Sequence, residues 1–269
     1  MIGRRLLLAA PLAGCTAGLV PLDGASDFDA QALLAKSAAA HGSLAGLAEI
    51  RVAYAGRFDS LVGRLQPELV DAGHRSLAQD TVTLPYGRHT QMQSGPAGAK
   101  RVQRDPGTAP STVRVWFDGI EAIDRPRRDA AAVVADCYRL FLLGPLMLTG
   151  AGAEQRRLTM VLAEPENIIV NGQAHPCDVI RMTLRPGLGL SERDELLLFI
   201  DRAQQLMRRV RFTLNGHVPT RGAIAETDCW GHVAQGGVRW ATQYEERLLR
   251  PAPLPVHEWR MTGLGVVRG

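Results

Sequence analysis

The segment ELLLFIDRAQQLMRRVRFTL, residues 195–214, decides the fold because its two halves are strands that need different surroundings. The first half, Leu196–Ile200, is apolar at every position, so a hydrophobic layer must cover each of its faces. The second half, Met207–Leu214, alternates, with Arg209 and Arg211 on the face opposite its apolar side chains, which predicts one face in water. In a curved antiparallel sheet, the two coverings of the first strand can be a packed helix and an internal cavity.

Period-two alternation recurs on both sides of this segment. It predicts strands over Ile50–Ala55, Thr81–Leu84, Ser111–Phe117, Leu158–Leu162, Ile168–Val170, Cys177–Leu184, Ile224–Trp230 and Val238–Leu248. Turn signals such as Asn171-Gly172 and Asn215-Gly216 recur at intervals of roughly 10 residues, which indicates an antiparallel meander curled into a sheet or barrel. The range Gly95–Pro110, rich in Gly, Pro, Lys and Arg, is interpreted as a mobile loop. No internal repeat or second domain is apparent.

Helical spacing appears twice. Asp27 can cap a helix over Phe28–Ala40, which Gly42 would end. A second helix is predicted from Asp129 to about Leu143, with a wide apolar stripe and Gly144-Pro145 behind it. A helix this apolar must be covered on most sides, by protein core or by a ligand.

The N-terminal residues resemble an export signal. Arg4-Arg5, a short apolar run and Leu12-Ala13-Gly14-Cys15 resemble a bacterial lipoprotein signal, which implies cleavage after Gly14 and acylation of Cys15 with diacylglycerol and an N-acyl chain. Residues 1–14 are then a signal peptide, 15–26 a lipidated tether and 27–269 a single domain. Thr16 resembles signals for release to the outer membrane, on its periplasmic face. The alternative is an uncleaved apolar segment that belongs to the core.

Composition narrows the possible functions. The chain of 269 residues is 46% hydrophobic and 22% charged, which is ordinary for a globular fold. The formal net charge of +4 includes Arg4 and Arg5, so the mature chain is close to neutral and nucleic acid is not an expected partner. Beyond Cys15, the remaining cysteines either form one disulfide with one free thiol or stay buried as small apolar residues: Cys137, Cys177 and Cys229.

No catalytic or metal site is predicted. The chain contains no Gly-x-Ser-x-Gly nucleophile elbow and no Gly-x-x-x-x-Gly-Lys-Ser/Thr phosphate loop. The seven histidines do not occur in close pairs, and the cysteine spacing is unlike that of a zinc site. No cofactor is therefore expected apart from the covalent lipid.

Four short motifs carry a family resemblance: Ala40-His41-Gly42, Trp116–Gly119, Phe199–Asp201 and Leu206–Val210. Together they are similar to the superfamily of outer-membrane lipoprotein carriers and receptors, LolA and LolB, over most of residues 30–250. The chain departs from the carriers, because it lacks their arginine-proline strand and begins with a lipoprotein signal.

The resemblance implies an α+β fold: an open, incomplete antiparallel β-barrel or strongly curved sheet of roughly eleven strands, with helices plugging the concave face. The cavity would hold a lipid, an acyl chain or an acylated protein, bound by burial at about 0.8 kcal/mol per methylene. Such binding needs no directional chemistry, so no sharp motif is expected.

The candidate ligand contacts come from the apolar helix and strands. They are Trp116, Tyr138, Phe141, Leu142, Leu197 and Phe199, for which the alternative is a place in an ordinary core. Two rival functions are an assembly lipoprotein that binds another envelope protein through loops such as Gly95–Pro110, and an envelope hydrolase with a cleft and an acid–base pair.

Overall fold

The computed structural model describes residues 27–84, 87–105, 113–149 and 157–269. The predicted signal peptide, the tether and Cys15 lie outside the described residues. Five α-helices and one short 3-10 helix are present in the described part of the chain. They are α1 (Asp27–His41), α2 (Ser60–Leu65), α3 (Pro67–Val70), α4 (Arg125–Leu143), α5 (Pro145–Thr149) and η1 (Val218–Thr220).

The strands fall into a large and a small sheet. The small sheet is the pair β12 (Val233–Gln235) and β13 (Val238–Trp240). The large sheet contains β1 (Leu47–Phe58), β2 (Leu77–Thr83), β3 (Arg88–Gly95), β4 (Gly98–Arg104), β5 (Val113–Phe117), β6 (Ile120–Glu121), β7 (Arg157–Val170), β8 (Gln173–Leu184), β9 (Asp194–Asp201), β10 (Met207–Thr213), β11 (Ile224–Trp230), β14 (Gln243–Arg250) and β15 (Leu254–Arg268).

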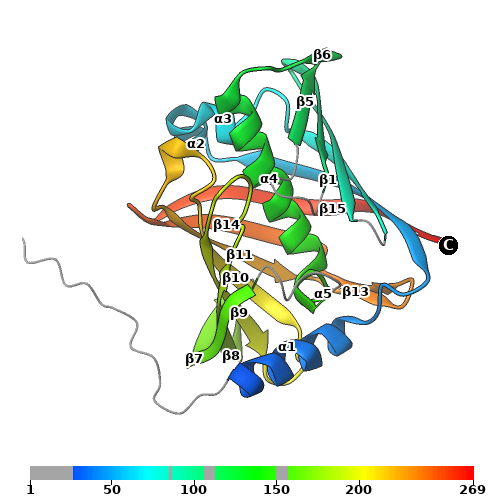
Figure 1. Cartoon of the computed structure of the whole chain (residues 1–269), viewed down its shortest axis with the longest axis vertical. Helices are drawn as coiled ribbons and strands as arrows, with labels where there is room; N and C mark the ends of the chain where they lie inside the picture. The colour runs from blue at the N-terminus through cyan, green and yellow to red at the C-terminus, as the bar shows by residue number, and fades with distance from the viewer. Residues whose placement is uncertain (1–26, 85–86, 106–112, 150–156) are drawn as a thin grey trace, which may run out of the picture.

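The 13-stranded sheet has the order β6-β5-β4-β3-β2-β1-β15-β14-β11-β10-β9-β8-β7, and β6 and β7 are its edges. The sheet is therefore not closed, and it curves around α4, as Figure 1 shows. A curved antiparallel sheet with a helix on its concave face was the expected architecture. The strand number is larger than the eleven implied by the resemblance.

The expected loop over Gly95–Pro110 is wrong for most of its described part. Residues Gly98–Arg104 form β4, which pairs with β3 in register Ser94↔Ala99 and with β5. The Lys and Arg content that suggested a loop is divided between the two faces of this strand. Lys100 and Arg104 are buried on the inner face, whereas Arg101 is exposed on the outer one.

The C-terminal strand β15 was not predicted. It begins within the proline-rich run Pro251–Pro255. It pairs with β1 over Leu47↔Arg268 to Phe58↔His257 and with β14 over Gln243↔Arg260 to Leu248↔Leu254. It is thus the strand that joins the N-terminal half of the sheet to the C-terminal half.

The decisive hairpin β9–β10 behaves differently on its two faces. Leu198 on β9 and Phe212 on β10 belong to the main core on the concave side. Phe199 belongs to a separate cluster on the other side, where β7 and β8 supply the apolar neighbours. Both faces of β9 are covered as predicted, and the covering of the outer face comes from side chains of β7 and β8.

The predicted water-exposed face of β10 is wrong at Arg209. This side chain is 7% exposed and pairs with Asp228 of β11, with Nε and Oδ1 separated by 2.5 Å. Its Nη2 also donates to the carbonyl oxygen of Ile169 on β7 at 3.0 Å. Alternation correctly identified the polar face, but the neighbouring strands cover it with ion pairs.

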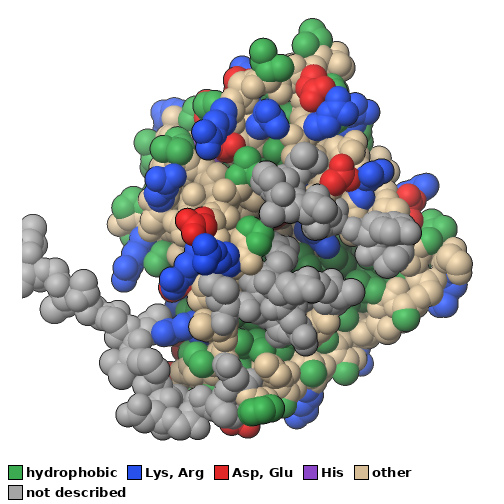
Figure 2. Space-filling model, viewed as in Figure 1, with side chains coloured by type: hydrophobic (Ala, Val, Ile, Leu, Met, Phe, Trp, Pro, Cys, Tyr) green, Lys and Arg blue, Asp and Glu red, His purple; other side chains and the backbone are tan. Residues whose placement is uncertain are grey.

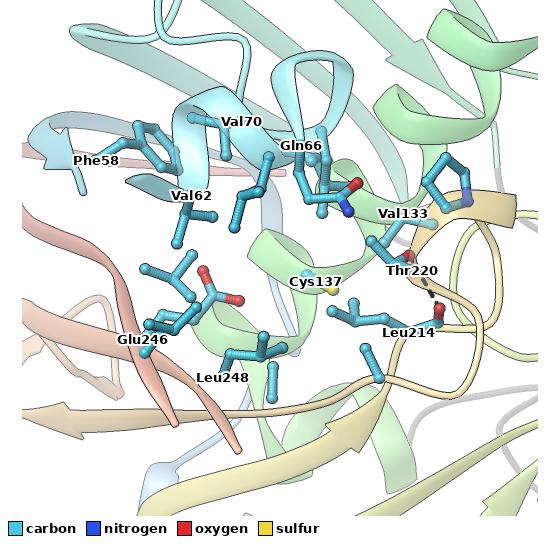
Figure 3. Close-up of a pocket in the computed structure, with 18 of the residues that line it drawn as sticks. Phe58, Val62, Gln66, Val70, Val133, Cys137, Leu214, Thr220, Glu246 and Leu248 are labelled. Atoms are coloured by element: carbon cyan, nitrogen blue, oxygen red, sulfur yellow. Dashed lines mark hydrogen bonds between the residues drawn. The ribbon is translucent and has the colours of Figure 1, made fainter. Parts of the chain in front are cut away.

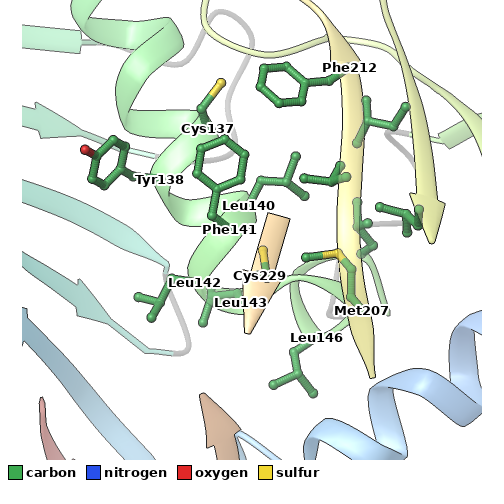
Figure 4. Close-up of a cluster of buried hydrophobic side chains, with 14 of the residues drawn as sticks. Cys137, Tyr138, Leu140, Phe141, Leu142, Leu143, Leu146, Met207, Phe212 and Cys229 are labelled. Carbon is green, nitrogen blue, oxygen red and sulfur yellow. The ribbon is translucent and has the colours of Figure 1, made fainter. Parts of the chain in front are cut away.

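Helix α4 is the apolar plug. It starts one turn before the predicted Asp129, because Asp124 caps it by accepting a hydrogen bond from the Arg127 N–H at 3.1 Å. Gly144 ends it with φ 49°. Fourteen of its nineteen residues are buried, so core covers it on most sides, as expected (Figure 4). Phe141 packs at 5.6 Å from the rings of both Phe212 and Trp259.

Candidate functional site

An apolar cavity of about 270 Å³ lies between α2, α3, α4 and the ends of β10, β11, β14 and β15 (Figure 3). Of its 22 lining residues, 18 are apolar, and the four others are Gln66, Arg75, Thr220 and Glu246. The cavity therefore offers an apolar interior with two charged groups, Arg75 and Glu246.

Helices α2 and α3 form one wall because local signals start and stop them where β1 ends. The Asp59 side chain accepts a hydrogen bond from the Leu61 N–H at 2.8 Å, which caps α2. Pro67 occupies the first position of α3, and Asp71 ends that helix in the left-handed conformation with φ 47°. Val62 is thereby directed into the cavity.

Arg75 is held at the inner end of this wall and is only 7% exposed. Its Nη1 donates to the carbonyl oxygens of Leu69 at 2.8 Å and Val70 at 3.2 Å, and its Nη2 donates to the Tyr138 hydroxyl at 3.2 Å. The guanidinium also lies 4.5 Å from the centroid of the Phe58 ring. In the part of the chain that the structure describes, no carboxylate comes within 4.0 Å of it.

Glu246 enters the cavity from β14. Figure 3 shows its carboxyl group directed into the space between Val62 and Cys137. Burial raises the pKa of Glu246 to about 7, against the opposing effect of the Arg75 charge. No hydrogen bond to its carboxyl oxygens is formed by any residue that the structure describes.

A chain of polar contacts leads from Arg75 into the sheet. The Tyr138 hydroxyl lies 3.3 Å from Nδ1 of His257 on β15. The His257 ring stacks on Phe58, with centroids 3.7 Å apart. Burial lowers the pKa of His257 well below its usual range, so this ring is neutral at pH 7, and burial raises the pKa of Tyr138 to about 12. Arg75 is thus the charged group of this network.

Two of the three predicted ligand contacts on α4 line the cavity. Tyr138 and Phe141 line it, whereas Leu142 is buried in the main core beside it. Whether Tyr138 and Phe141 contact a ligand remains a prediction.

The other three predicted contacts lie elsewhere. Leu197 and Phe199 belong to the outer cluster, because odd positions of β9 face away from α4. Trp116 lies on the outer face of β5, where its ring is 3.8 Å from the Arg101 guanidinium and 4.8 Å from that of Arg114. None of the three lines the apolar cavity.

Two functional candidates were missed. Alternation along β14 places Glu246 on the same face as Tyr244 and Leu248, so an acidic residue on an apolar face was a readable signal. Arg75 lies in the connection between α3 and β2, where no periodicity indicates burial.

The described cysteines are free thiols. Cys137 lines the cavity, and Cys177 and Cys229 are buried. Burial raises the pKa of all three thiols, to about 12 for Cys177. Of the two alternatives, the structure shows buried apolar-type cysteines.

A polar cavity of about 330 Å³ lies on the other side of α3. There the Asp71 carboxylate accepts from His74 Nδ1 at 2.8 Å and from Lys100 Nζ at 2.6 Å. Among the described residues that line it there is no Ser, Thr or Cys, so this Asp–His pair has no hydroxyl or thiol nucleophile beside it.

Three further features of the described residues are their surface charge, the length and apolar character of their helices, and the grouping of possible metal ligands. Lys and Arg side chains are interspersed with Asp and Glu over the face seen in Figure 2. Within the described ranges, no helix has both the length and the apolar character needed to cross a bilayer, and no cluster of His, Cys, Asp and Glu could hold a metal ion.

Comparison with known proteins identifies the fold. No family model matches the sequence, and no curated protein matches it significantly. Among solved structures, a candidate outer-membrane lipoprotein-sorting protein domain from Vibrio parahaemolyticus aligns with TM-score 0.52 at 10% identity, covering 91% of this chain and 94% of that one.

Two further structures are similar. A DUF1329 family protein from Desulfovibrio piger aligns with TM-score 0.52 at 12% identity, over 88% of this chain and 92% of its own. A LolA superfamily protein from Nitrosomonas europaea aligns less closely, with TM-score 0.44 at 11% identity and coverages of 89% and 94%. The likeness to the structures from Vibrio parahaemolyticus and Desulfovibrio piger extends over most of each chain and is a likeness of fold.

Proposed function

We propose that this protein binds an acyl chain of a lipid or of an acylated protein in the apolar cavity, as a lipid-anchored, non-enzymatic component of the bacterial envelope. The observation that carries the proposal is the set of 18 apolar residues among the 22 that line the cavity, on the concave side of an open sheet. The fold shared with a lipoprotein-sorting domain supports it.

Burial energetics agree with this ligand class. About ten methylenes moved from water into the cavity would contribute about 8 kcal/mol. A binding free energy of about 8 kcal/mol corresponds to a Kd of about 1 μM, and the loss of translational and rotational freedom offsets part of it, so an affinity weaker than micromolar is expected. The predicted anchor at Cys15 would hold the cavity beside the periplasmic face of the outer membrane.

The rival functions have less support. The assembly proposal would be supported by binding through exposed loops such as Gly95–Pro110, and Gly98–Arg104 within that range is strand β4. The hydrolase proposal needs a cleft with an acid–base pair; the Asp71–His74 cavity holds such a pair, but no Ser, Thr or Cys is among the described residues that line it.

The test uses the full chain with Cys15→Ser, which prevents acylation, and N-phenyl-1-naphthylamine, a neutral fluorophore that brightens in apolar sites. Leu248 lines the cavity and its neighbour Leu249 does not. We expect Leu248→Trp to weaken probe binding by about tenfold or more, since the indole fills the space, and Leu249→Trp to leave it unchanged. Absence of probe binding to the parent chain, or equal effects of the two substitutions, would contradict the proposal.

A further inference from the structure

We infer that the cavity binds a single-chain amphiphile through a carboxylate, with the head group buried against Arg75 and the chain along the apolar walls. This inference rests on the proposed function and goes beyond it. A cavity that held only acyl chains would leave the polar end of the ligand outside.

Arg75 is the first observation. It is 7% exposed, lines the cavity and has no carboxylate within 4.0 Å among the described residues. Its three hydrogen bonds go to neutral oxygens, and they use Nη1 and Nη2. No described residue accepts from its Nε–H. A buried guanidinium is normally paired with an anion, because desolvation of an unpaired charge costs several kcal/mol. A ligand carboxylate would supply the missing charge.

The fixed orientation of Arg75 is the second observation. The carbonyl oxygens of Leu69 and Val70 hold one edge of the guanidinium, and the Tyr138 hydroxyl holds its Nη2. The Phe58 ring covers one of its faces. An orientation set in advance by the protein reduces the entropy lost when a planar carboxylate binds.

Glu246 is the third observation. Its carboxyl group is directed into the same cavity and has no hydrogen-bond partner in the described part of the chain. The titratable groups around it are Arg75 from the α3–β2 connection, Tyr138 and Cys137 from α4, and His257 from β15; α2 and β11 contribute apolar Val62 and Ala225.

Glu246 therefore makes binding of the acid depend on pH. When protonated, Glu246 is neutral and can donate a hydrogen bond to a bound carboxylate, whereas the ionised form repels it. Since burial raises the pKa of Glu246 to about 7, the acid should bind best below neutral pH.

The size of the cavity favours one chain. About 270 Å³ is just below the range of about 300–1,000 Å³ that is usual for small-molecule pockets, so a single alkyl chain with a small head group fits better than a diacyl lipid.

The test compares dodecanoate with methyl dodecanoate as competitors of N-phenyl-1-naphthylamine on the full chain with Cys15→Ser. At about pH 6 we expect the acid to bind about tenfold more tightly than the ester, as a charge-assisted contact requires. At about pH 8.5 the advantage should fall several-fold, whereas Glu246→Gln should retain it. Arg75→Met should abolish the advantage, and the exposed control Arg57→Met should not.

The outcomes separate the two proposals. Equal affinity for acid and ester overturns the carboxylate inference but leaves acyl-chain binding intact, whereas failure of both competitors to bind overturns the proposed function. Tighter binding of dodecyl phosphate than of dodecanoate would overturn the carboxylate class. If Arg75→Met does not fold, the acid–ester ratio of the parent chain and of Glu246→Gln decides the question.

Discussion

Arg104 on β4 and Asp136 on α4 form a buried, bidentate ion pair that attaches the plug helix α4 to the concave face of the sheet. Nε lies 3.0 Å from Oδ1 and Nη2 lies 2.7 Å from Oδ2. Gly189, in the β8–β9 connection, completes the arrangement: its carbonyl oxygen accepts from Arg104 at 2.7 Å and its N–H donates to Asp136 at 2.9 Å. Three segments far apart in sequence thus meet at one carboxylate.

Loss of Asp136 should be strongly destabilising. Asp136→Ala leaves Arg104 buried without its carboxylate, and we expect the free energy of unfolding in urea to fall by about 3 to 5 kcal/mol. The control is Glu121→Ala, which removes the partner of Arg114 in an exposed pair and should change the free energy of unfolding far less than Asp136→Ala. Similar losses in both variants would show that the buried pair has no special role.

Glu246→Gln should stabilise the fold in a pH-dependent way. The pKa of Glu246 is raised from 4.5 to about 7, so the folded state retains a proton that the unfolded state has lost between these values. Stability of the parent chain should fall as pH rises through this window, and the variant should gain about 1 to 3 kcal/mol above pH 7. Glu245→Gln, on the opposite face of β14, is the control. Denaturation at several pH values checks this, and a gain already complete below pH 4.5 would refute it.

The three described thiols should be protected by the fold. In the full chain with Cys15→Ser, we expect Ellman's reagent to label Cys137, Cys177 and Cys229 only after denaturation, because burial raises the pKa of each thiol. Fast labelling of the native protein, or a missing thiol in the denatured protein, would be inconsistent with free buried cysteines.

The predicted anchor has a direct test. The parent protein should partition into the detergent phase of Triton X-114 and carry the mass of an acylated cysteine, whereas Cys15→Ser should remain in the aqueous phase. Cys177→Ala serves as the cysteine control and should behave like the parent. Detergent partitioning of Cys15→Ser would eliminate the anchor.

Local pattern predicted the elements whose signals lie close together in the chain. Helix α1 was expected at Phe28–Ala40 and observed at Asp27–His41, and the core of α4 was correct because apolar spacing and Gly144 are local. Strand β15 was missed, since the proline run before it resembles the end of a domain. Its place in the sheet depends on two partners that start about 200 residues and ten residues upstream.

The sequence by itself determined the alternation of β10, the apolar character of α4 and the expectation of a concave apolar face. Only the tertiary structure decided which polar residues are buried: Arg209 lies under β7, and Arg75 and Glu246 share one cavity. The physical reason is the separation along the chain of the residues involved. Periodicity records which face of an element is apolar, whereas burial of a polar side chain depends on sheet register and curvature, which bring distant segments together. The strand pattern at 195–214 therefore predicted that both faces of β9 are covered and that one face of β10 is in water, whereas in the fold Arg209 on that face is buried.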